Sequence, residues 1–269
     1  KEASDALGED VGLLIQQGPK EALALTTNTQ PVMLVAAVAA WRVWRSEGGA
    51  LPAVVAGHSL GEYSALVASG VLTLAQAAPL VRFRAAAMQE AVPVGTGAMA
   101  AILGMDAARV IAGCAEAQAT FGAGSAVVVE AVNFNDPAQT VIAGSKAAVE
   151  KACEMLKASG AKRALPLPVS APFHSSLMKP AAEKLKEKLA NTVLAAPQIP
   201  VVNNIDVAVQ TDAEAIRDAL VRQAFGPVRW VECVLAIKAR GITTLVECGP
   251  GKVLAGMTKR IDAELTGAA

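Results

Sequence analysis

The residues most able to do chemistry in this chain are a serine and the glycines around it. Ser59 lies in Gly57-His58-Ser59-Leu60-Gly61, which follows the apolar run 53–56 and precedes a helix-forming segment, 62–69. A serine in such a turn between a strand and a helix exposes its hydroxyl at the top of a sheet, and the two glycines allow the tight turn and close helix packing. The N–H of Leu60 can then face a developing oxyanion. The pattern predicts Ser59 as an acyl-accepting nucleophile.

A serine nucleophile needs a base, and the chain has only two histidines. His58 adjoins the serine, so we expect its ring to diverge from the hydroxyl. His174 follows a proline-containing turn and precedes a predicted helix, and it is the predicted base. The group that orients it stays open. Asp206 and Glu247 lie near the ends of predicted strands, and an amide side chain or a backbone carbonyl would also serve.

Arg84 lies one predicted helix beyond the serine, in the otherwise apolar stretch Phe83-Arg84-Ala85-Ala86-Ala87-Met88. Arginine is rarely buried without a partner. A solvated or ion-paired helix arginine is one interpretation, and a bidentate clamp for a substrate carboxylate is the other. The spacing alone favours neither.

Helices and short strands alternate through most of the chain. Helices are predicted at 30–46, 74–91, 175–191, 212–224, 231–240 and 253–261, and strands at 53–56, 200–203 and 243–247. Such alternation predicts an α/β core with a mostly parallel sheet covered on both faces.

The middle of the chain has a different order of elements. Strands are predicted at 98–103, 127–132, 140–144 and 163–167, and helices at 106–118 and 147–159, with an Asn-rich turn between the second and third strands. This order, β-α-β-β-α-β, is a split βαβ unit. We therefore expect a small domain, 96–168, inserted in a discontinuous core made of 1–95 and 169–269.

Composition excludes several classes of protein. The 269 residues have a formal net charge of zero, which argues against a nucleic-acid-binding protein. The four cysteines form no C-x-x-C pair, so disulfides and a cysteine zinc site are not expected and a reducing cytoplasm fits. The longest apolar run, 32–41, is too short to span a bilayer, and no signal-peptide pattern opens the chain.

Several motifs, in one order along the chain, resemble those of the malonyl-CoA:acyl-carrier-protein transacylase family of bacterial fatty-acid synthesis. The matching segments are 57–66, Arg84 with Met88-Gln89, 95–101, 132–135, 141–144, Leu167-Pro168-Val169-Ser170 through His174, 201–204 and 247–254. A series of motifs is far more specific than the serine turn alone.

The resemblance implies a hydrolase-like α/β core with a ferredoxin-like insert. It implies that Ser59 is the nucleophile and His174 the base, that Arg84 binds the malonyl carboxylate, and that Gln223 orients the histidine through a neutral group. It also implies further residues at the substrate: His58, Met88, Asn133 and Phe173. No metal or other cofactor is expected. The family's Gly-Gln-Gly-x-Gln segment, whose glutamine helps form the oxyanion hole, is not in this sequence, and we expect it to precede Lys1.

The activity implied is transfer of a malonyl group from coenzyme A to the pantetheine thiol of acyl carrier protein, through a malonyl-serine intermediate. Malonyl-CoA and the carrier protein are the expected partners, and a cytoplasmic monomer is expected. Three alternatives stay open: an acyltransferase of a polyketide system, a serine acyl-hydrolase or esterase, and a non-catalytic acyl-binding module.

Overall fold

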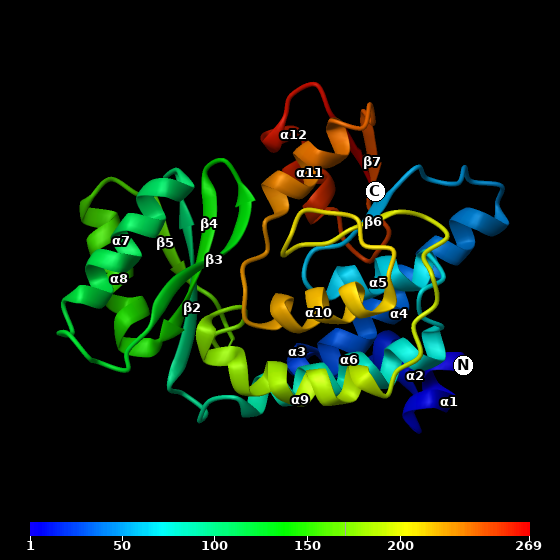
Figure 1. Ribbon diagram of the computed structural model, residues 1–269, viewed down its shortest axis with the longest axis horizontal. Helices are drawn as coiled ribbons and strands as arrows, with labels where there is room; N and C mark the ends of the chain where they lie inside the picture. The colour runs from blue at the N-terminus through cyan, green and yellow to red at the C-terminus, as the bar shows by residue number, and fades with distance from the viewer. Residues whose placement is uncertain (170) are drawn as a thin grey trace.

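The computed structural model describes residues 1–169 and 171–269, so Ser170 of the predicted motif lies outside the described residues. The chain forms a mixed α/β structure with both parallel and antiparallel sheets. Figure 1 shows the strands β2 to β5 with helices α7 and α8 at one end of the molecule, and the remaining elements gathered in a larger part beside them.

The larger part contains two short parallel strand pairs. β1 (Val55–Ala56) pairs with β6 (Val201–Val202), and β7 (Thr244–Val246) pairs with β8 (Thr266–Ala268). The pairing is parallel, as predicted, but it is less extensive than the expected sheet, because the chain turns away directly after β1 and β6 to build the serine turn and its support. The sequence did not predict β8, which is short and lacks an alternating apolar pattern.

Helices make up most of the larger part; those after residue 25 lie close to the predicted ranges, and the three short helices before it were not predicted. They are α1 (Glu2–Leu7), α2 (Val11–Gln17), α3 (Lys20–Ala24), α4 (Thr26–Ser46), α5 (Leu60–Ala68), α6 (Leu74–Glu90), the 3-10 turn η1 (Ser176–Met178), α9 (Lys179–Ala190), α10 (Ala213–Ala224), α11 (Trp230–Lys238) and α12 (Val253–Ile261). Among the described residues, no helix is both long and apolar enough to cross a membrane.

The main core of this part lies between α4, α5, α6, α9 and α10. Their inward faces carry side chains that repeat at helical spacing and are almost completely buried, among them Leu34, Tyr63, Leu80, Leu185 and Leu220. This packing fixes α5 and α6 against each other, so the serine turn before α5 and the arginine on α6 are held at a constant separation.

The smaller part is a four-stranded antiparallel sheet in the order β3-β4-β2-β5. Its elements are β2 (Gly97–Leu103), α7 (Ala107–Ala119), β3 (Val129–Asp136), β4 (Gln139–Ser145), α8 (Lys146–Ala158) and β5 (Arg163–Pro166). Ile102, Ile142, Val110 and Leu156 form the core between the sheet and its two helices. The opposite face packs against the segment that leads to His174 through Phe173.

The Asn-rich segment between β3 and β4 differs from the prediction. The expected turn residues Asn133 and Asn135 belong to β3, which continues to Asp136 through two register irregularities. The strand continues because its free edge finds a partner in the larger part. The N–H of Val228 donates to the Val132 carbonyl at 2.8 Å, and the N–H of Phe134 donates to the Val228 carbonyl at 3.0 Å.

Candidate active site

The turn at Ser59 requires one of its two glycines. Ser59 itself has φ 51° and ψ −108°, a left-handed conformation that is strained for a residue with a side chain. A Cβ on Gly57 would lie 1.9 Å from the backbone carbonyl carbon of Gly61, so only glycine fits at 57. A Cβ on Gly61 would meet open space, so the expectation that both glycines allow close packing is right for Gly57 and wrong for Gly61.

An asparagine after β6 holds this turn in place. The N–H of Ser59 donates to Asn204 Oδ1 at 2.7 Å, and Asn204 Nδ2 donates to the Gly57 carbonyl at 2.8 Å. These two bonds offset part of the strain at Ser59, which costs about 1–3 kcal/mol in general. Asn204 was in a predicted motif but was not among the predicted site residues; its position at the carboxyl end of a parallel strand was the available signal.

His174 lies against the serine hydroxyl. Its Nε2 is 2.7 Å from Ser59 Oγ, and its Nδ1 is 2.8 Å from the backbone carbonyl oxygen of Gln223. A carbonyl can only accept, so Nδ1 carries the proton and the lone pair of Nε2 faces the hydroxyl. Burial, followed by the charge of Arg84, lowers the pKa of His174 to about 3. The imidazole is therefore neutral at ordinary pH and can accept the serine proton.

The orienting group of His174 is thus the Gln223 carbonyl, one of the options that the sequence left open. Neither candidate acid contacts the imidazole. Asp206 accepts hydrogen bonds from Arg222 at 2.6 and 2.8 Å, and Glu247 accepts from the N–H of Ala255 at 2.8 Å.

Arg84 points from α6 into the same site and is only 2% exposed. Its Nη1 donates to Gln30 Oε1 at 2.8 Å, and its Nη2 donates to Gln223 Oε1 at 3.0 Å and to Ser59 Oγ at 3.2 Å. Within the described ranges, no carboxylate forms an ion pair with it. The guanidinium is therefore a buried positive charge held by neutral amides, which excludes the interpretation as a solvated or ion-paired helix arginine.

Sequence reasoning missed Gln30, the glutamine in the second turn of α4 that supports Arg84. It is a buried polar residue directly before the long apolar run at 32–41, and that contrast was the signal for it.

Among the described residues, the N–H of Leu60 at the start of α5 has no hydrogen-bond partner. The next two amides bond backwards, Gly61 to the His58 carbonyl at 2.8 Å and Glu62 to the Ser59 carbonyl at 3.1 Å. The first amides of a helix have no intrahelical partner. The Leu60 N–H is therefore placed to donate to an oxygen that develops negative charge beside Ser59.

His58 diverges from the serine hydroxyl, as expected. Its Nε2 lies 2.8 Å from Asn135 Oδ1, and its ring centroid lies 5.7 Å from that of Trp230. Asn135 and Trp230 were not predicted at the site. Their side chains link the serine turn to β3 of the smaller part and to α11 of the larger part.

The other residues predicted to contact the substrate, Asn133, Phe173 and Met88, differ in how deeply they are buried. Asn133 lies on β3, and its buried Oδ1 has no hydrogen-bond partner among the described residues. Phe173 is half-buried directly before His174. Met88 is 1% exposed in an apolar cluster against which Phe173 packs, so it lies behind the site wall.

A groove of about 490 Å³ reaches His174 from the surface. It runs between α7 and β3 on one side and the segment after α10 on the other. The lining residues are Ile111, Cys114, Ala115, Gln118, Val129, Glu130, Ala131, Val132, Phe134, His174, Phe225 and Pro227. This volume is within the usual range for sites that bind small molecules or cofactors.

The chain resembles known proteins in both sequence and fold. Residues 3–263 match the family model described as an acyl transferase domain. The malonyl CoA-acyl carrier protein transacylase of Salmonella typhimurium is 57% identical over 268 residues, covering 100% of this chain and 85% of that protein. The relative from Bacillus subtilis with the same name is 45% identical over 264 residues, covering 98% and 81%.

Solved structures give the same relationship. The acyl-carrier-protein S-malonyltransferase of Burkholderia pseudomallei superposes with a TM-score of 0.95 at 67% identity, covering 99% of this chain and 85% of that one. A malonyl-transacylase solved in complex with its holo type II PKS acyl-carrier protein has a TM-score of 0.94 at 53% identity, covering 100% and 86%. The chain therefore belongs to the acyl transferase family and, within it, to the malonyl CoA-acyl carrier protein transacylases.

Proposed function

We propose that this chain transfers a malonyl group from malonyl-CoA to the pantetheine thiol of an acyl carrier protein. The observation that carries the proposal is the buried Arg84 guanidinium, 3.2 Å from the Ser59 hydroxyl and bonded to neutral amides. A guanidinium binds a carboxylate through two parallel hydrogen bonds, and a low-dielectric site strengthens that attraction. A malonyl thioester brings a free carboxylate to this position, whereas the neutral ester of an ordinary esterase substrate would leave Arg84 without a counter-ion.

In the proposed reaction, His174 Nε2 takes the proton of Ser59 Oγ as the oxygen attacks the thioester carbonyl. The Nδ1–H bond to the Gln223 carbonyl keeps the ring in place and stabilises the imidazolium. The Leu60 N–H donates to the oxyanion. The C–S bond then breaks, coenzyme A leaves with the proton from His174, and a malonyl ester remains on Ser59.

The second half repeats these steps with a new thiol. The pantetheine thiol gives its proton to His174, its sulfur attacks the ester carbonyl, and Ser59 leaves as the hydroxyl. The cycle is ping-pong because the first product departs before the second substrate reacts.

Four further residues are proposed to shape the acyl and pantetheine site. His58 and Asn133 supply polar groups beside the serine turn, and the unpartnered Asn133 Oδ1 supports a role in binding a donor on the substrate. Phe173 lines the acyl pocket next to the base. Met88 supports Phe173 from the apolar cluster behind it.

The groove that reaches His174 is the proposed entry for the pantetheine arm of the carrier protein. The presence of His174 in the lining of this groove, and the relative solved with a carrier protein, support this assignment. Fatty-acid synthesis is the pathway we propose, with polyketide synthesis as the alternative. A monomeric state and a cytoplasmic location stay predictions.

We also propose a domain division in which 96–168 form a ferredoxin-like insert, and 1–95 with 169–269 form a hydrolase-like core. The strand order β3-β4-β2-β5, with α7 and α8 on one face, supports the insert. In this division, one wall of the groove belongs to the insert, through α7 and β3, and the other wall, with His174, belongs to the core.

Mass spectrometry of the intact protein tests the function. Incubation with malonyl-CoA should add one malonyl mass, and addition of holo carrier protein should remove it to the carrier. Ser59→Ala should abolish the adduct, whereas Ser64→Ala, on the same helix, should keep it. An adduct that water discharges as fast as the carrier does would indicate a hydrolase, and an undiminished adduct on Ser59→Ala would overturn the nucleophile.

A further inference from the structure

Glu62 is a buried carboxylate under the active site that none of the proposed steps uses. It lies in the first turn of α5, three residues after Ser59, and is 2% exposed. A glutamate at this position of a helix usually reaches solvent, and burying its charge is costly. Burial raises the pKa of Glu62 to about 7. The contacts of the carboxylate must therefore explain why it is buried.

These contacts of Glu62 are hydrogen bonds from two residues. Its Oε2 accepts a hydrogen bond from the backbone N–H of Asn204 at 2.8 Å and another from Gln223 Nε2 at 3.0 Å. One carboxylate oxygen on α5 therefore joins the segment after β6 to α10, the next helix along the chain.

Asn204 and Gln223 together hold both members of the reacting pair. The side chain of Asn204 fixes the strained Ser59 turn by bonding the Ser59 N–H and the Gly57 carbonyl. The side-chain Nε2 of Gln223 donates to the Ser59 carbonyl at 3.1 Å, and the backbone carbonyl of Gln223 orients the His174 ring. The short Ser59–His174 distance depends on both supports keeping the same relative position.

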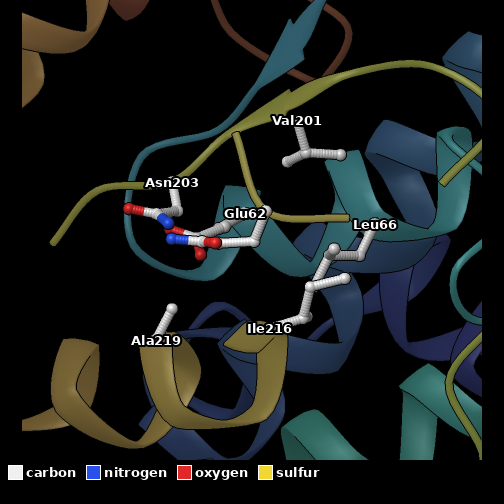
Figure 2. Close-up of a pocket in the computed structure, with 7 residues that line it drawn as sticks. Glu62, Leu66, Val201, Asn203, Ile216 and Ala219 are labelled. Carbon is white, nitrogen blue, oxygen red and sulfur yellow. The ribbon is translucent and has the colours of Figure 1, made fainter. Parts of the chain in front are cut away.

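The space beside Glu62 is too small for a substrate. A cavity of about 10 Å³ lies there, which has room for a single water-sized molecule. Figure 2 shows the Glu62 and Asn203 side chains together on one side of this cavity, with Leu66, Val201 and Ile216 around the rest. The cavity is lined mostly by apolar side chains, with Asn203 and Gln210 as the other polar ones, so Glu62 acts on the site through its bonds to Asn204 and Gln223.

We propose that Glu62 is a positioning residue, whose single carboxylate oxygen holds Asn204 and Gln223 in register and thereby sets the Ser59–His174 geometry for acyl transfer. The inference rests on the proposed serine–histidine chemistry. Glu62 does not touch the reacting atoms, so it is not itself a catalytic group.

Several charged or titratable groups surround this carboxylate. Arg84 on α6 favours its ionised form, and Asp206 after β6 disfavours it. Tyr63 on α5 and Cys233 on α11 are neutral, because burial raises the pKa of each to about 12. His174 is neutral because burial lowers its pKa to about 3. Glu62 is therefore the group in this cluster that changes charge near neutrality.

Labelling with phenylmethanesulfonyl fluoride, a small neutral serine reagent, separates this inference from malonyl recognition. Glu62→Leu has a similar volume but no acceptor, and it should slow labelling of Ser59 and malonyl transfer by about a hundredfold, the usual effect of misplacing reacting groups by about an ångström. Glu62→Gln can turn its amide oxygen to both donors, so it should recover most of the rate.

The pH dependence supplies a readout that a merely structural residue would not give. A charged acceptor forms stronger hydrogen bonds than a neutral one. The ratio of wild-type to Glu62→Gln labelling rates should therefore be close to one at pH 6 and rise to about fivefold at pH 8.5. Leu66→Ala, which lowers stability on the same helix and lines the same cavity, is the matched control and should keep the wild-type labelling rate.

The outcomes are distinct. Labelling of wild type without malonylation would overturn the proposed function and leave the positioning test intact. Wild-type labelling of Glu62→Leu would overturn the positioning role, and so would a wild-type to Glu62→Gln ratio that does not change with pH. If Glu62→Leu does not fold, the Glu62→Gln ratio alone decides.

Discussion

Two arginines show how differently this fold treats its surface and its site. Arg222, on the outer side of α10, is half-buried and bonds to two carboxylates, Asp206 at 2.6 and 2.8 Å and Asp218 at 2.6 Å. Arg84 is almost completely buried; among the described residues its hydrogen bonds go to two glutamine amides and the Ser59 hydroxyl, and its guanidinium lies 5.4 Å from the centre of the Tyr63 ring. Gln223, the residue after Arg222 in sequence, is one of the two glutamines that bond to Arg84.

The exposed Arg222 is paired with carboxylates, whereas the buried Arg84 is bonded to neutral groups. Burying a charge without an opposite charge costs several kcal/mol even when hydrogen bonds remain. The surface arginine, which would cost little if solvated, has two carboxylates, whereas in the described part of the chain no carboxylate contacts the buried arginine directly. The arrangement is explained if the proposed malonyl carboxylate supplies the missing negative charge beside Arg84. Variants of the two arginines and of His174 test this explanation.

The largest expected effect is on the buried side. Arg84→Ala should lower kcat/KM for malonyl-CoA by about two to four orders of magnitude, because a bidentate charged pair contributes about 3–5 kcal/mol. Acetyl-CoA has no carboxylate to lose, so the malonyl-to-acetyl ratio of kcat/KM should fall. That ratio, measured in wild type and variant, checks the prediction.

Arg84→Lys is the control for charge alone. Lysine keeps the positive charge but loses the planar fork, so it should recover little of the malonyl rate. If the ratio stays at the wild-type value in both variants, Arg84 is a structural residue and the comparison with Arg222 loses its meaning.

The next largest expected effect is on the free energy of unfolding of the protein in acid, through the buried His174. His174 has a folded pKa of about 3 and an ordinary unfolded pKa of about 6.5, so between these values only the unfolded chain binds the proton. The free energy of unfolding should therefore fall as pH falls from 6.5 towards 3, by up to about 1.4 kcal/mol per pH unit from this group. His174→Gln should lose less stability over the same range.

Urea unfolding at pH 6.5 and 4.5 measures this difference. Glu62 works in the opposite direction, since its raised pKa makes the folded chain bind the proton more tightly between about 4.5 and 7. Both proteins carry Glu62, so its contribution cancels in the comparison. Equal losses in wild type and variant would show that the folded protein protonates His174 at an ordinary pKa.

The sequence predicted the parts of the site that have a local signature. The Ser59 turn has glycines at a fixed spacing, His174 had no competing base, and most helices have an apolar period that tertiary packing did not change. The βαββαβ order was readable for the same reason, because each strand and helix there is long enough to show its own pattern.

The parts that could not be predicted depend on partners far apart in the chain. Gln30 and Asn204 meet the site only after α4 and the segment following β6 have folded against α5 and α6. β3 extends through Asn133 and Asn135 because Val228 of the other part pairs with its edge, and no local pattern contains that information. The open position of Gly61 likewise depends on what surrounds the turn, not on the turn itself.

The smallest expected effect is on the surface side. Arg222→Gln removes the ion pairs with Asp206 and Asp218, yet these carboxylates are partly solvated, so the loss in the free energy of unfolding should stay below about 1 kcal/mol. Arg222 lowers the pKa of Asp206, so the pair contributes fully above the ordinary carboxyl pKa and is lost only in stronger acid. Urea midpoints at pH 7.5 and pH 3 measure the size of this loss and its dependence on pH.

Malonyl transfer by Arg222→Gln should stay within about twofold of wild type, because the Gln223 contacts to Arg84, Ser59 and His174 do not involve the Arg222 side chain. A tenfold loss of transfer would show that the surface pairs fix α10 for the site, and the two arginines would then be parts of one network.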